Sequence, residues 1–139
     1  MYQEPDRNIG VIGMIHPVLE KEDLNAGKLG IVQYIDYLND GVGLDIAPST
    51  FYRTEAILVL KPRSIHIHEL TKAESKAVDR DAIRCFNGLL DKETDESKKQ
   101  ALKFAYDNST LRGMVVVDFR DYIEWEMERY EDHNRGRNR

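Results

Sequence analysis

The chain has 139 residues, of which 41% are apolar and 32% charged, and Cys85 is its single cysteine. A chain of this length buries roughly two-thirds of its unfolded surface, so it does not need disulfides to hold a core. The net charge is −5, with 6 basic and 10 acidic residues in 1–69 and 14 and 15 in 70–139. Neither half is therefore a basic platform for nucleic acid.

No apolar run reaches the length of a membrane-spanning helix, and the first residues lack the cationic start and apolar stretch of a signal peptide. We therefore expect a cytoplasmic protein without membrane contact. The one cysteine also fits a reducing compartment.

Short apolar runs at period two, separated by turn residues, fill the first half of the chain. This pattern predicts strands over 9–15, 28–38, 42–46, 51–60 and 64–69. Asn39, Asp40 and Gly41 form a hairpin turn signal, since these residue types tolerate the positive φ of tight hairpins.

In the second half of the chain, apolar residues recur at spacings of three and four residues, which predicts helices. Thr71 and Glu74 match a capping box and predict a helix start. Its inward face is predicted to hold Val78, Ala82, Cys85, Phe86 and Leu89. A second helix, ending near residue 106 after a charged connection over 91–97, should turn Ala101, Leu102 and Ala105 inward.

The stretch from Met114 to Phe119 suits a buried strand by propensity. An apolar stripe at helical spacing runs through it, however, and favours one helix of about two dozen residues, capped by Ser109 or Thr110 and ending near His133. The stripe consists of Leu111, Val115, Phe119, Tyr122, Ile123, Met127 and Tyr130.

These elements predict an α+β fold. A small antiparallel β-barrel or twisted sheet occupies 1–70, and a helical region of two to three helices over 71–133 packs on it. A disordered basic tail follows over 134–139. The order of hairpin, turn and final strand resembles an SH3-like barrel in its pattern.

Two clusters of polar residues are candidates for metal or acid–base sites. His66 and His68 alternate on the strand predicted over 64–69, and two imidazoles on one face can share a metal ion. A metal site needs further ligands, so we expect an exposed polar face instead. Asp36, Asp40 and Asp45 surround the first hairpin and are interpreted as solvated loop acids.

Trp125 lies far from the apolar stripe of the predicted long helix, and Met114 shares its azimuth. Tryptophan and methionine are enriched where protein partners bind. We therefore predict Trp125, Met114 and Val117 as partner-binding residues, and no catalytic, cofactor or metal site.

The function expected from the sequence is that of a small non-enzymatic accessory or regulatory protein that binds a larger protein or itself. The first alternative is a nucleic-acid-associated protein that stacks bases on the strand aromatics Tyr34, Tyr37, Phe51 and Tyr52 and uses the arginine tail. The second is a metal-dependent hydrolase at His66 and His68.

Overall fold

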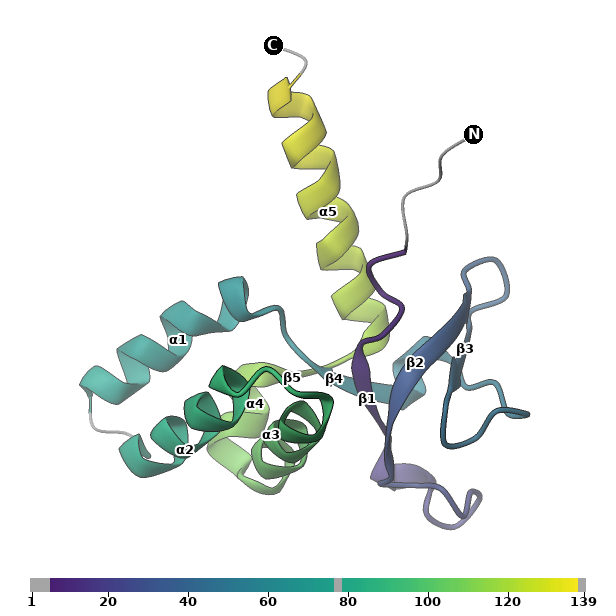
Figure 1. Cartoon of the computed structure of the whole chain (residues 1–139), viewed down its shortest axis with the longest axis horizontal. Helices are drawn as coiled ribbons and strands as arrows, with labels where there is room; N and C mark the ends of the chain where they lie inside the picture. Colours follow the sequence, from purple (N-terminus) through teal and green to yellow (C-terminus); the bar gives the residue numbers. More distant parts are fainter. Residues whose placement is uncertain (1–5, 77–78, 138–139) are drawn as a thin grey trace.

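The structure is a computed structural model that describes residues 6–76 and 79–137 (Figure 1). Within them the fold is α+β, with one antiparallel sheet and helices that mostly follow it, as predicted. The strands are β1 (Ile12–Ile15), β2 (Leu29–Asp36), β3 (Gly41–Leu44), β4 (Ile57–Leu60) and β5 (Val116–Asp118). The helices are α1 (Arg63–Ser75), α2 (Arg80–Asp91), α3 (Asp95–Asp107), α4 (Ser109–Val115) and α5 (Phe119–Arg137), with short 3-10 turns η1 (Pro17–Leu19) and η2 (Thr54–Ala56).

The sheet is open, in the order β3-β2-β1-β4-β5, and every neighbouring pair runs antiparallel. Its edges are β3 and β5, so the closed barrel given as one alternative is wrong. The segment 64–69, expected as the last barrel strand, is helical, and the fifth strand comes from the C-terminal half of the chain. The SH3-like pattern is therefore not confirmed.

Helix α1 replaces both the strand predicted over 64–69 and the helix start predicted at Thr71. His66 and Leu70, four residues apart, are both buried, whereas Ile67 is 44% exposed. A helical face therefore packs inward here, and the period-two alternation of isoleucines does not set the structure. Thr71 lies inside α1, where its hydroxyl donates to the carbonyl of Ile67 (2.8 Å), and the predicted unit boundary at residue 70 falls within this helix.

The single long helix predicted from residue 109 to 133 is also wrong, because β5 separates α4 from α5. Residues Val116–Asp118 pair with Leu60–Leu58 of β4, which would otherwise be an open edge. Val116 and Val117 are β-branched, which favours this extended backbone. Asn108, not Ser109 or Thr110, caps α4 through its side-chain oxygen, which accepts from Leu111 N (3.0 Å).

The last helix also ends later than predicted. Its backbone is helical through Arg137, whereas the sequence suggested an end near His133 and a tail from residue 134. The last two residues of that predicted tail lie outside the described residues.

The inward faces of the helices were predicted in part. In α2, Phe86 is buried as expected, but Cys85 is exposed and Ile83 is buried in its place. Val78 lies outside the described residues. In α3, the predicted inward residues are all fully buried: Ala101, Leu102 and Ala105.

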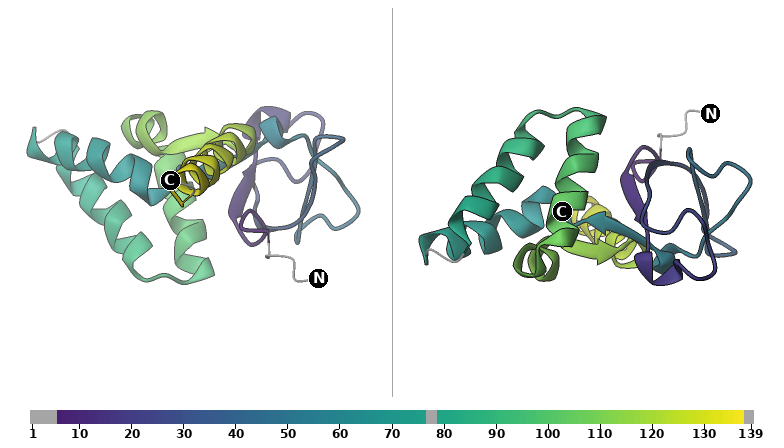
Figure 2. Two further views of the ribbon diagram at one scale, coloured as in Figure 1. Left: turned by 90° about the horizontal axis from the view of Figure 1, so that it is seen from above. Right: turned by 90° about the horizontal axis from the view of Figure 1, so that it is seen from below.

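Two helices cover opposite faces of the sheet. Leu102 of α3 packs with Ile12 and Met14 on one face, and Phe119 and Ile123 of α5 pack on the other. Figure 2 shows α1–α4 gathered beside the sheet, with α5 between them and the β2–β3 hairpin. In the part of the chain that the structure describes, every helix is too short or too polar to cross a bilayer.

Candidate functional site

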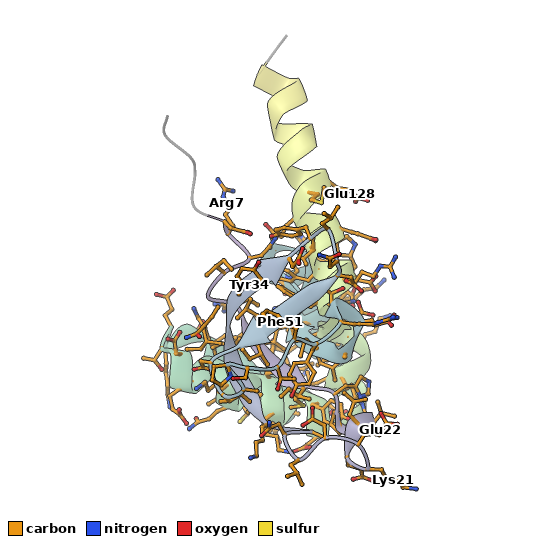
Figure 3. All side chains as sticks on the ribbon, turned by 90° about the vertical axis from the view of Figure 1, so that its right-hand side faces the viewer. Arg7, Lys21, Glu22, Tyr34, Phe51 and Glu128 are labelled. Atoms are coloured by element: carbon orange, nitrogen blue, oxygen red, sulfur yellow. The ribbon has the colours of Figure 1, made fainter. Side chains whose placement is uncertain are left out.

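Two aromatic side chains lie exposed and adjacent on the outer face of the β2–β3 hairpin, as Figure 3 shows. Tyr34 is 54% exposed and Phe51 is 60% exposed, and their ring centroids are 5.5 Å apart in an edge-to-face arrangement. We call Tyr34 and Phe51, together with Gly41 and Gly43 of β3, the aromatic surface.

An irregularity in β2 turns Tyr34 toward solvent. Side chains alternate along a strand, so Tyr34 would regularly share a face with Val32, which is fully buried. The register shifts between these two residues, however: Val32 lies opposite Leu44, and Tyr34 lies opposite Gly43. A bulge of this kind re-aims a side chain, and here it brings an aromatic ring to the surface.

Phe51 is directed outward by its neighbour Tyr52. The backbone of Tyr52 exchanges two hydrogen bonds with Val42, at 2.8 and 2.9 Å, and this bridge places the Tyr52 side chain in the core. Tyr52 is only 7% exposed, and burial raises its pKa to about 12. Tyr52 is therefore unavailable for the base stacking that the nucleic-acid alternative assigned to it, whereas Phe51 points the opposite way.

The glycines of β3 leave room for the two rings. A Cβ at Gly43 would lie 3.6 Å from the Phe51 ring and 3.7 Å from Tyr34 Cβ, and one at Gly41 would lie 3.9 Å from the Phe51 ring. Side chains beyond Cβ at these positions would occupy the space that Phe51 covers. Alternate glycines on β3 thus create a bare strip on which an aromatic ring lies.

Tyr37, also exposed, has a structural role at its polar end. Its hydroxyl accepts from Asn8 Nδ2 (3.0 Å) and donates to Asp6 Oδ2. Partial burial, followed by the effect of Asp6, raises its pKa to about 12. Tyr37 therefore ties the segment before β1 to the end of β2.

The three hairpin acids each have a local structural role, so the interpretation as merely solvated loop acids is incomplete. Asp36 accepts hydrogen bonds from the side chain and backbone of Asn39, which lower its pKa. Asp45 accepts from Ile31 N (2.8 Å). Asp40 accepts from the Thr54 hydroxyl (2.6 Å).

The positive φ of the hairpin turn is at Asp40 (+54°) and not at a glycine of the turn. The sequence pattern predicted a positive φ among Asn39, Asp40 and Gly41, and the structure places it at Asp40. Asp40 combines left-handed backbone with a side-chain hydrogen bond across to Thr54, so it is a structural residue of this turn.

The two histidines weighed as metal ligands do not share a face. Both lie on α1, two residues apart and so about 200° apart around the helix axis. His66 is 1% exposed with its ring 5.7 Å from that of Phe86, whereas His68 is exposed. Among the side chains that the structure describes, no group of three or more His, Cys, Asp or Glu residues could hold a metal ion.

The three predicted partner-binding residues lie on three different elements. Met114 of α4 packs against the helical core cluster, and Val117 of β5 packs against the sheet cluster. Trp125 of α5 is half-buried, with Lys61 Nζ 5.8 Å from its ring centroid. The expectation that Trp125 and Met114 share an azimuth required a continuous helix, and it is wrong because β5 separates α4 from α5. A binding role for the three residues stays a prediction.

No family model, curated protein or solved structure matches this chain.

The aromatic surface is what the geometry offers as a site for contact. The sequence predicted Tyr34 and Phe51 as strand residues available for base stacking. It did not predict that their two rings would lie against each other. The alternation Gly41-Val42-Gly43-Leu44, which leaves one strand face bare, is the sequence signal that points to it.

Proposed function

We propose that this protein is a binding module that docks on a protein partner through the aromatic surface. The observation that carries the proposal is the exposed edge-to-face pair of Tyr34 and Phe51 beside the edge strand β3. Exposed aromatic residues are typical of energetically dominant contacts in protein interfaces. The chain itself performs no catalysis in this proposal and acts as a cytoplasmic accessory factor of a larger protein.

The charge around the aromatic surface favours a protein over a nucleic acid. Asp36 lies against Gly41, with 3.7 Å between its Cβ and the position of a Cβ on the glycine. Asp40 and Asp45 belong to the same hairpin and the residue just after it. Carboxylates repel phosphates, so the partner that fits is a protein segment with an apolar centre and basic residues around it.

Site-specific photo-crosslinking in cells tests this proposal. A benzophenone amino acid replaces Phe51 in one variant and Leu24, which is 96% exposed in a loop before β2, in the control. We expect the Phe51 probe to form a discrete protein adduct that the Leu24 probe does not form. Tyr34→Ala should weaken binding of the purified adduct partner by about 2 kcal/mol, as expected for a hot spot, with an unchanged melting temperature.

Three results would contradict the proposal. The first is equal adduct patterns at both probe positions. The second is affinity unchanged by Tyr34→Ala. The third is salt-dependent retention of the protein on a single-stranded oligonucleotide that is lost in Phe51→Ala, which would support the nucleic-acid alternative instead. An adduct of twice the chain mass would identify the partner as a second copy of the chain.

A further inference from the structure

A cavity of about 580 Å³ lies away from the aromatic surface, where four parts of the chain meet. The segment before β1 forms one wall, the junction of β4 and α1 a second, the turn between α2 and α3 a third, and α5 contributes Tyr122. This volume lies in the range of sites for small organic ligands.

Cationic side chains gather around this cavity, although the whole chain is acidic. The lining includes Arg7, Lys61, Arg63 and Lys98, against one carboxylate, Glu93. Lys61, whose side chain is 15% exposed, lies 3.8 Å from Glu69, which is longer than a hydrogen bond. Arg63 donates to Asp91 (2.7 Å), and this contact joins the start of α1 to the end of α2.

The N-terminus of α1 opens onto the same cavity. Pro62 and Arg63 line it, no side chain caps this end of the helix, and its first turn contains no acidic residue. The first backbone N–H groups of a helix have no intrahelical acceptors, so an uncapped N-terminus attracts anions. The helix end therefore adds donors and positive potential to the lysine and arginine side chains.

His66 is a buried polar side chain of this cavity that lacks a hydrogen-bond partner in the part of the chain that the structure describes. It lines the cavity and is 1% exposed, and its Nδ1 has no hydrogen-bond partner within the described residues. A buried polar atom without a partner costs free energy that a bound ligand can restore. Burial, then the charges of Arg63 and Lys61, lowers the pKa of His66 to about 4, so the imidazole is neutral at pH 7 and offers a hydrogen bond rather than a charge.

Part of the cavity wall is apolar. Ile12 of β1, Leu60 of β4 and Leu102 of α3 belong to its lining. A bare inorganic ion would leave this wall unused, whereas a molecule with an apolar body would cover it.

We propose that this cavity binds a small organic anion, a molecule with an apolar body and a phosphate or carboxylate group. The anionic group lies among Arg7, Lys61 and Lys98 at the N-terminus of α1, where it accepts a hydrogen bond from His66 Nδ1, and the body lies against the apolar wall. This site is independent of the aromatic surface, so either proposal can fail without the other.

Calorimetric titration of the full chain with simple probes tests the proposal. The probes are phenyl phosphate, benzoate, inorganic phosphate and the neutral phenol. We expect saturable binding of phenyl phosphate or benzoate at low salt, and whichever binds more tightly identifies the anionic group. Binding of phenol or inorganic phosphate should be weaker by about tenfold or more, because each lacks one of the two recognised parts.

Two pairs of variants separate the site from general charge effects. Lys98→Glu should weaken binding by about tenfold, and Lys99→Glu, the same charge change one residue along α3 and outside the cavity lining, should change it less than about twofold. The control for Arg7→Glu is Lys21→Glu. Figure 3 shows Lys21 at the far end of the molecule from Arg7. Arg7, Lys21 and Lys98 are exposed and Lys99 is partly exposed, so we expect these variants to keep the fold, and circular dichroism checks this.

The nitrogen resonances of the His66 imidazole give a readout that a purely structural role would not move. They should shift on saturation with phenyl phosphate or benzoate and stay fixed with phenol. The proposal is wrong if neither organic anion binds saturably. It is also wrong if Lys98→Glu and Arg7→Glu weaken binding no more than their controls Lys99→Glu and Lys21→Glu. Unchanged His66 nitrogen resonances on saturation, or binding of inorganic phosphate as tight as that of the organic probes, would likewise contradict it.

Discussion

At the scale of single residues, His66 shows how burial changes chemistry that the sequence suggests. Its alternation with His68 resembles a pair of metal ligands, but on α1 one imidazole is buried beside Phe86 and the other is exposed. The buried ring loses its hydration and lies near Arg63 and Lys61, and all three effects disfavour the protonated form.

The lowered pKa of His66 makes the free energy of unfolding depend on pH. Between about pH 4 and 6.5, the unfolded chain binds a proton that the folded protein rejects, so stability is greatest above pH 6.5 and falls as the pH decreases toward 4. We expect the urea midpoint to be lower at pH 5 than at pH 7.

A variant isolates the contribution of His66 to this pH dependence. His66→Leu removes the titrating group and should reduce the difference between pH 5 and pH 7, whereas His68→Leu should preserve it. The lowered pKa values of Asp23 and Asp36 affect stability only below about their ordinary pKa of 3.8, outside this window. Equal pH dependence in the wild type and His66→Leu would show that His66 is not the group responsible.

At the scale of elements, a capping-box pattern marks a helix start only where its reciprocal hydrogen bonds form. Thr71 and Glu74 match the capping-box pattern but lie inside α1. The box forms instead at the start of α3, where Thr94 Oγ1 accepts from Ser97 N (3.0 Å) and Ser97 Oγ accepts from Thr94 N (3.1 Å). These two residues lie in the stretch 91–97, which the sequence predicts as a charged connection.

Substitutions at the two threonines separate the motif from the cap. Thr94→Ala should lower the free energy of unfolding by about 1 kcal/mol, the usual effect of losing an N-cap. Thr71→Ala, in the interior of α1 where alanine is a strong helix former, should have a smaller effect. Denaturant midpoints of both variants measure this difference, and a larger loss in Thr71→Ala would contradict the cap at Thr94.

At the scale of the whole molecule, the stretch from α4 through β5 to α5 joins the helical part to the sheet. Val115 of α4 packs in the helical cluster, β5 completes the sheet beside β4, and Phe119 of α5 packs in the sheet core. Because α4, β5 and α5 follow one another directly in the chain, none of them can detach without disturbing the other two. We therefore expect the two parts to unfold together.

Phe119→Ala tests this coupling. Phe119 is fully buried, so its truncation should cost about 3–5 kcal/mol. Met127→Ala on the same helix, where the side chain is 57% exposed, should be nearly neutral. In both variants, far-ultraviolet circular dichroism and the fluorescence of Trp125 should report one coincident transition, and two separated transitions would show that the parts unfold independently.

Local patterns determined much of this protein from the sequence. Period-two runs and turn residues predicted the four strands of the N-terminal half, and helical spacing predicted the buried residues of α3. These features succeed because a strand or helix with one buried face imposes its own period on the sequence. The exposed aromatic residues of the hairpin were also named from the sequence, although Tyr52 beside them is buried.

Tertiary structure decided what local pattern left ambiguous. Residues 64–69 alternate like a strand, yet they are helical, with His66 packed against Phe86 of α2. Val116 and Val117 interrupt the predicted long helix because they pair with the free edge of β4. The bulge that exposes Tyr34 and the cavity beside His66 likewise depend on residues distant in the chain. Such contacts have no period in the sequence, since their energy comes from partners that only the folded chain brings together.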